Sequence, residues 1–145
     1  MIAFADSSVV VARYAPHEVD VLPDGATVVV SHIARVEVAS ALWRQSRDGL
    51  FSPADAATFL REFEADWVGT PFESAKYHAI TVDRTVLTRA AGLTGIHSLR
   101  TLDAIQLASA LAARDAEPEC QTMVVLDERL RWAAATEGFA LLPVR

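Results

Sequence analysis

The sequence predicts an α/β fold, with a mainly parallel central sheet of about five strands and helices on both faces. Short apolar runs, rich in β-branched residues, alternate along the chain with segments of helical periodicity. Strands separated by helices need crossover connections, and these give parallel strands that are covered on both faces. The 145 residues, 52% of them hydrophobic, suffice for one core, so we expect one domain over residues 1–145.

The first part of the chain contains two predicted strands, each followed by a helix. Ile2–Ala5 is the first apolar run, and the short helix Ser7–Tyr14 ends before Pro16, which cannot continue a helix. Thr27–Ser31 is a β-branched strand, and residues 33–45 have helical periodicity.

A third helix has a clear start signal. Ser52 provides a capping hydroxyl, Pro53 suits the first helical position, and Asp55 places an acid in the first turn. We expect this helix to run to about residue 66. Residues 67–72 then form either a short strand or an extended connection.

The middle of the chain is predicted as a helix over residues 73–91, in two pieces because Thr81, Val82 and Thr85 weaken it. Residues 92–98 contain two glycines and are predicted to be a loop.

The last part begins with a strong helix over residues 102–114, for which Thr101 is the expected cap. Three further elements follow, a buried strand, a helix and a final strand, at residues 121–126, 128–137 and 139–143.

Composition excludes several classes of protein. The net charge of −6 argues against a protein that coats nucleic acid or binds membranes through a basic surface. The single cysteine, Cys120, excludes a disulfide within the chain and a cysteine-based zinc site. The first residues, MIAFAD, lack the basic region of a secretory signal, and no apolar run approaches the ~18 residues of a membrane span. We therefore expect a soluble protein in the cytoplasm, with no membrane association.

Familiar catalytic motifs are also missing. The six glycines are too scattered for a phosphate-binding loop, and no serine lies in a G-x-S-x-G elbow. The four histidines include no pair at helical ligand spacing, which disfavours a histidine-rich metal site.

Four carboxylates occupy informative positions. Asp6 directly follows the first strand and Asp127 directly follows the strand at 121–126, and ligands of open α/β sheets bind outside the carboxyl ends of the strands. Glu37 lies on a helix face of small and apolar residues, and Asp103 is in the first turn of the helix that follows Thr101.

Each of these acids also has a purely structural explanation. Asp6 and Asp127 could cap the helices that follow them, and Asp103 could be an acid favoured by the helix dipole. Glu37 could form a structural salt bridge with an arginine. The sequence alone leaves these alternatives open.

Taken together, the four acids suggest a metal site. Clustered carboxylates repel one another, and a divalent cation removes this conflict. Oxygen ligands alone favour Mg²⁺ or Mn²⁺, and Mg²⁺ favours phosphate oxygens, so we expect a phosphodiester or phosphate ester substrate. One or two ions would activate a water and stabilise the leaving oxygen.

The chain resembles the PIN-domain ribonucleases, and most closely the VapC-type toxins of bacterial type II toxin–antitoxin systems. The matching segments are FADSSVVVARY at 4–14, SHIARVEVASALWR at 31–44, LRTLDAIQLASAL at 99–111 and LDERLRWAAATEGF at 126–139. They occur in the family's order and spacing and cover essentially the whole chain. The third segment is the most specific.

The resemblance implies roles for individual residues. Asp6 and Asp103 would be the main ligands of Mg²⁺ or Mn²⁺, and Glu37 and Asp127 would complete the metal's shell or hold a water on it. Ser8 matches the family's hydroxyl position and would orient Asp6 or a water.

Two positions depart from the family pattern. Val125 stands where relatives often have a threonine, so a hydroxyl that could organise Asp127 is missing. Gln106 stands where relatives often have a histidine, and we expect little consequence.

Arginines near the motifs are candidates for contacting the RNA backbone, because arginine binds phosphate in a bidentate way. Each of them could equally be a solvated or salt-bridged surface residue. The candidates are Arg13, Arg35, Arg44 and Arg100.

The resemblance implies a Mg²⁺- or Mn²⁺-dependent endoribonuclease that cleaves RNA as the toxin of a toxin–antitoxin pair. It also implies a cognate antitoxin, bound in a groove for which helices 33–45 and 53–66 are plausible walls, and a homodimer. Two alternatives remain: a phosphatase or DNA nuclease that uses the same acids, and a catalytically silent binding module.

Overall fold

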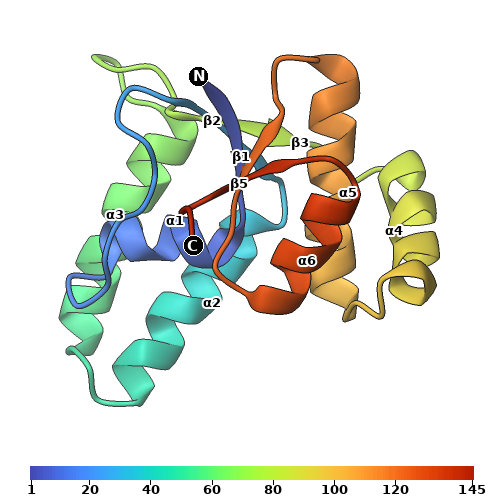
Figure 1. Ribbon diagram of the computed structural model, residues 1–145. Coiled ribbons are helices and arrows are strands. Elements are labelled where there is room, and N and C mark those ends of the chain that lie inside the picture. Colours follow the sequence, from blue (N-terminus) through green and yellow to red (C-terminus); the bar gives the residue numbers. More distant parts are fainter.

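Five parallel strands form the centre of the computed structural model, which describes all residues 1–145 (Figure 1). They are β1 (Ile2–Ala5), β2 (Thr27–Ser31), β3 (Tyr77–Ile80), β4 (Thr122–Val124) and β5 (Ala140–Leu142). Their order in the sheet is β3-β2-β1-β4-β5, so β1 is central and pairs with β2 on one side and β4 on the other. The predicted α/β fold with a parallel sheet is confirmed.

Six helices cover the two faces of the sheet. They are α1 (Ser7–Tyr14), α2 (Ala34–Arg47), α3 (Pro53–Val68), α4 (Arg84–Ile96), α5 (Thr101–Ala116) and α6 (Glu128–Thr136). Figure 1 shows α1, α2 and α3 on one side of the sheet and α4, α5 and α6 on the other. No helix is long and apolar enough to cross a lipid bilayer.

Alternate side chains of the strands feed two separate hydrophobic cores, as the period of two in a strand requires. Ala3, Ala5 and Val30 belong to the core beneath α1, α2 and α3. Phe4 and Met123 belong to the core beneath α4, α5 and α6. The central strand is therefore apolar on both faces, and its only polar neighbours lie at its ends.

The elements of the first part of the chain match their predictions closely. β1, α1 and β2 have the predicted bounds, and α2 is shifted by one or two residues at its ends. The start of α3 is as predicted: the Ser52 hydroxyl accepts a hydrogen bond from the Asp55 N–H at 3.1 Å, and Pro53 is the first helical residue. The helix ends at Val68, slightly beyond the predicted residue 66.

The prediction for the middle of the chain is wrong in part: residues 84–91 are helical as predicted, but the segment before them is not. Residues 67–72 contain no strand, and the third strand is instead β3, inside the segment 73–91 that was predicted to be helical. Gly69 ends α3 with a φ of 85°, and a Cβ there would lie 2.9 Å from the Ala75 amide nitrogen. This tight turn returns the chain to the sheet, where β3 pairs with β2 at its edge.

The predicted loop at 92–98 is also wrong, because α4 continues through Gly92 and Gly95 to Ile96. The helix begins where the Asp83 side chain accepts a hydrogen bond from the Val86 N–H at 2.9 Å. Each helical glycine costs about 1 kcal/mol relative to alanine, and packing of the buried face of α4 against α5 outweighs this cost.

Smaller differences occur in the last part. Thr101 is the first residue of α5 and not its cap; Arg100 occupies the cap position without a side-chain capping bond. The last two strands are shorter than the predicted segments 121–126 and 139–143, because only their central residues pair.

A buried network holds the far end of α1 in place. The Tyr14 hydroxyl donates to Asp66 of α3 at 2.6 Å and lies 2.6 Å from the Tyr77 hydroxyl of β3. Since Tyr14 has a single O–H, Tyr77 donates to Tyr14. Lys76 completes the network with an ion pair to Asp66 at 3.0 Å. The orientation of α1, which starts next to Asp6, is thus fixed at both ends.

We expect Tyr14→Phe to lower the free energy of unfolding by about 2 kcal/mol, because Asp66 loses a hydrogen bond and the buried Tyr77 hydroxyl loses its acceptor. Urea denaturation measures this loss. Tyr77→Phe is the matched variant and should cost less, since it leaves the bond between Tyr14 and Asp66 intact. Equal losses in the two variants would contradict this account.

Candidate active site

The candidate site lies at the carboxyl ends of the central strands. Asp6 directly follows β1, and its backbone N–H donates to the carbonyl oxygen of Val124, the last residue of β4, at 3.0 Å. β1 and β4 are neighbours in the sheet and pair in parallel. Asp6 and Asp127 leave the same edge of the sheet.

Asp6 is buried, with 7% of its surface exposed, although it is an acid. The Ser8 hydroxyl donates to its Oδ2 at 2.7 Å. Burial, together with the nearby charges of Glu37 and Asp103, raises the pKa of Asp6 to about 6, although the hydrogen bond from Ser8 lowers it. Asp6 occupies the cap position of α1, but its side chain makes no capping bond, so the structural explanation of this residue is wrong.

Glu37 is held by two neighbouring helices. Its Oε1 accepts hydrogen bonds from the Ser7 hydroxyl of α1 at 2.9 Å and from Gln106 Nε2 of α5 at 2.8 Å. It has no arginine partner, so the alternative of a structural salt bridge is wrong. Gln106 is 1% exposed and also donates to Ser7 at 2.6 Å. Gln106 therefore takes part in the site, and the expectation that its replacement of a histidine has little consequence stays a prediction.

Asp103 lies in the first turn of α5 and is half-buried. Burial raises its pKa, and the charge of Asp127 raises it as well, while the charges of Arg100 and Arg129 lower it. Arg100 Nε is 3.9 Å from Asp103 Oδ2, which makes a loose, solvent-exposed ion pair.

Asp127 does cap a helix, as its structural explanation requires. Its Oδ1 accepts a hydrogen bond from the Leu130 N–H of α6 at 2.9 Å, and the residue is exposed. Val125, which stands in place of a hydroxyl residue, is fully buried. Asp127 therefore has a structural task, and its charge also acts on Asp103.

The four predicted acids form one electrostatic group. Asp6 is affected by Glu37 and Asp103, and Asp103 is affected by Asp127. No three histidine, cysteine or acidic side chains are close enough in the structure to form a ready-made metal site. The donor chemistry nevertheless fits a hard cation, because the available ligands are oxygens. A positive charge would also offset the cost of burying the Asp6 carboxylate and its repulsion by the neighbouring acids, which raise its pKa.

Two adjoining hollows open beside these acids and share Glu37, Arg44 and Leu102. The first, of about 500 Å³, lies between α1 and α2 and is also lined by Ser8. The second, of about 1000 Å³, extends along the start of α5 to Asp103. Together they form one surface cleft, which is lined by two of the four acids, Glu37 and Asp103, while Asp6 and Asp127 do not line it.

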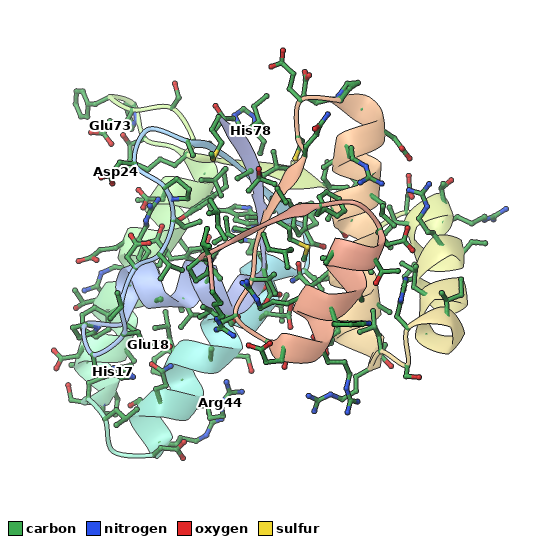
Figure 2. All side chains as sticks on the ribbon, viewed as in Figure 1. His17, Glu18, Asp24, Arg44, Glu73 and His78 are labelled. Carbon is green, nitrogen blue, oxygen red and sulfur yellow. The ribbon has the colours of Figure 1, made fainter.

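Two of the four candidate arginines line this cleft, and two do not. Arg44 and Arg100 line it, and Arg44 has no ion pair within 4.0 Å. Arg13 instead pairs with an acid of the following loop at 2.9 Å, and Arg35 pairs with Glu64 of α3 at 2.8 Å. Figure 2 shows Arg44 on α2, at the end of the molecule opposite to the labelled Asp24, Glu73 and His78.

Known proteins resemble this chain over most of its length. No family model matches the chain. Two curated relatives are each 30% identical to it over 123 residues, which is 84% of this chain and 78% of the relative. They are ribonuclease VapC45 of Mycobacterium tuberculosis (strain CDC 1551 / Oshkosh) and ribonuclease VapC49 of Mycobacterium tuberculosis (strain ATCC 25618 / H37Rv). The chain belongs to the VapC ribonuclease family. The resemblance drawn from the four sequence segments is thus confirmed.

Within this VapC fold, the sequence analysis did not predict that Ser7 and Gln106 would donate hydrogen bonds to Glu37. The signal for Gln106 was present, because an amide among the apolar residues of α5 needs a partner when it is buried. Ser7 gave no signal, because it lies next to Ser8 and either serine could serve the acids.

The raised pKa of Asp6 predicts a pH-dependent effect of Asp6→Asn. A carboxyl with a pKa of about 6 in the folded state and 3.8 ordinarily contributes stability that is present below about pH 4 and is lost as the pH rises through 6. At pH 7.5, in the absence of metal, Asp6→Asn should therefore raise the free energy of unfolding by about 3 kcal/mol at most.

Urea denaturation in EDTA at pH 4 and pH 7.5 measures this difference, which should vanish at the lower pH. Asp24→Asn, an exposed acid in a turn, is the control and should change stability little at either pH. A loss of stability in Asp6→Asn at pH 7.5 would show that the carboxylate is not under electrostatic strain.

Proposed function

We propose that this protein is a Mg²⁺- or Mn²⁺-dependent endoribonuclease and the toxin component of a type II toxin–antitoxin system. The observation that carries the proposal is Asp6: a buried carboxylate with a raised pKa, beside Glu37 and Asp103, at the carboxyl edge of the sheet. Acids whose pKa is shifted by burial and by neighbouring charges are typical of catalytic sites. Two relatives at 30% identity carry the name ribonuclease, which supports RNA as the substrate.

Asp6 and Asp103 are the main candidates to hold the cation, with Glu37 and Asp127 completing its surroundings. When bound, the cation would activate a water for attack on the phosphodiester and stabilise the leaving oxygen. Ser8 keeps Asp6 oriented through its 2.7 Å hydrogen bond. Because Asp127 already uses one oxygen to cap α6, only its second oxygen is available for this task.

The cleft also offers phosphate contacts to RNA. Arg44 and Arg100 line it together with Glu37 and Asp103, and both arginine side chains are exposed. Guanidinium groups bind phosphate oxygens in a bidentate way, so these two arginines can hold the RNA backbone beside the acids. With a net charge of −6, the protein does not attract RNA as a whole, and binding depends on these local contacts.

The partner of the toxin would be a cognate antitoxin. The hollow beside Glu37 has exposed apolar residues, Val36 and Leu102, next to Arg44. Its walls are α1 and α2, with Leu102 from α5, while α3 does not line it. This hollow is a second candidate for the antitoxin segment, beside the groove between α2 and α3 that the resemblance implies. The resemblance to VapC toxins also implies a homodimer.

Purified protein should cleave RNA in Mg²⁺ or Mn²⁺, and EDTA should abolish the cleavage. Asp6→Asn and Asp103→Asn should each lower the rate at least about 100-fold, because each removes a charge that holds the cation. Asp24→Asn, at the opposite end of the molecule, should cleave like the wild type. Full activity of either site variant would remove that residue from the proposed set.

The same assay decides between the alternatives. Competition between single-stranded RNA, DNA and a phosphomonoester separates a ribonuclease from a DNA nuclease or a phosphatase. Calorimetric titration with Mn²⁺ tests the silent module, which would release no heat and would not respond to Asp6→Asn.

We also expect Arg44→Ala to raise the KM for RNA about tenfold, because one charge-assisted phosphate contact is lost. The slope of binding affinity against salt concentration should fall by about one unit. Arg35→Ala is the matched control on the same helix, since its guanidinium is already paired with Glu64. Equal effects of the two variants would show that only the overall charge matters.

A further inference from the structure

Three side chains from three helices form a closed triangle at one wall of the cleft. Ser7 of α1 donates to Glu37 Oε1 at 2.9 Å, and Gln106 of α5 donates to the same oxygen at 2.8 Å. Gln106 also donates to the Ser7 hydroxyl at 2.6 Å. Two of the three hydrogen bonds are accepted by Glu37 Oε1, and the third is accepted by the Ser7 hydroxyl, which itself donates to that oxygen.

The orientation of the Gln106 amide follows from this triangle. Its Nε2 must face Glu37, because the reverse orientation would place two acceptor oxygens against each other. In this orientation Gln106 Oε1 is buried and has no hydrogen-bond partner. An unpartnered buried acceptor destabilises the fold, and an apolar side chain would avoid this cost. The residue is thus retained for the N–H groups that it offers to Ser7 and Glu37.

The two consecutive serines at the start of α1 serve different acids. Ser8 donates to Asp6 Oδ2, and Ser7 donates to Glu37 Oε1. Neighbouring residues of a helix point about 100° apart, so one pair of hydroxyls can reach acids on two different elements. Each hydroxyl leaves the second oxygen of its acid without a side-chain donor.

We propose that Ser7 and Gln106 are positioning residues that hold Glu37 in a single rotamer, with Oε2 directed to the cleft. Glu37 is half-buried and lines both hollows, so its second oxygen can meet a cation or its waters there. A free glutamate side chain would sample several rotamers, and fixing it in advance removes that entropy from binding. The catalytic consequence rests on the proposed function, but the clamp itself does not.

The clamp is tested first without any activity measurement. In metal-free wild-type protein, NMR should give well-separated shifts for the two γ-methylene protons of Glu37, as a single rotamer requires. In Gln106→Leu and in Ser7→Ala the two shifts should converge as the side chain averages over rotamers. Ser109→Ala is the matched control: this buried serine of α5 bonds only to Ser31 at 2.9 Å, and its loss should leave the Glu37 signals unchanged.

The consequence for the site is tested by Mn²⁺ titration and by kinetics. Residues that orient a ligand typically change metal affinity or activity by about 10- to 100-fold when removed. We expect losses of this size in Mn²⁺ affinity and in kcat for Gln106→Leu and Ser7→Ala, with KM nearly unchanged. Gln106→His, which retains a ring N–H donor, should recover part of the loss. In the Glu37→Ala background, neither variant should cause a further loss.

The outcomes separate this inference from the proposed function. If the wild type cleaves no RNA, the proposed function fails, while the Glu37 signals and the Mn²⁺ affinities still decide on the clamp. Unchanged Glu37 shifts in both variants overturn the clamp. Losses that persist undiminished in the Glu37→Ala background overturn the positioning role, because they would then not act through Glu37.

Discussion

The pairing of β1 between β2 and β4 is the constraint on which the rest of the structure depends. Because the central strand is apolar on both faces, it can only lie between two layers of helices. Parallel pairing then brings the carboxyl ends of neighbouring strands to one edge. The bond from the Asp6 N–H to the Val124 carbonyl fixes the first acid at that edge. The arrangement of the acids thus follows from the pairing of apolar strands.

The same constraint creates a conflict between stability and chemistry. Asp6 is buried because the backbone around it belongs to the core, and burial raises its pKa to about 6. Hydrogen bonds from neighbouring side chains reduce the cost of burying these acids. Ser8 donates to Asp6, while Ser7 and Gln106 donate to Glu37. Each acid keeps one oxygen without a side-chain donor. Hydrogen bonds therefore fix the positions of these acids, while their negative charges remain without a balancing positive charge.

The sequence predicted the strand end at Asp6 correctly and the elements in the middle of the chain only in part, for physical reasons. The position of Asp6 follows from local pattern, because a strand end and a helix start meet there. β3 could not be recognised, because Tyr77–Ile80 is a short edge strand in which only Tyr77 is buried, and pairing with β2 stabilises it. α4 passes through two glycines because of its packing against α5. The hydrogen bonds of Gln106 could not be predicted, because its partners lie 99 and 69 residues away in the chain.

The net charge of −6 has a different implication for nucleic-acid binding once the positions of the four acids are known. On composition alone it argued against a nucleic-acid partner. The four acids of the site contribute to that charge, and two exposed arginines, Arg44 and Arg100, line the cleft beside them. The protein would therefore repel a polyanion over most of its surface and attract it only at the cleft. A cation bound among the acids would strengthen that attraction. Under the proposed function, RNA would be bound at the cleft through these local contacts, with little attraction for nucleic acid elsewhere on the surface.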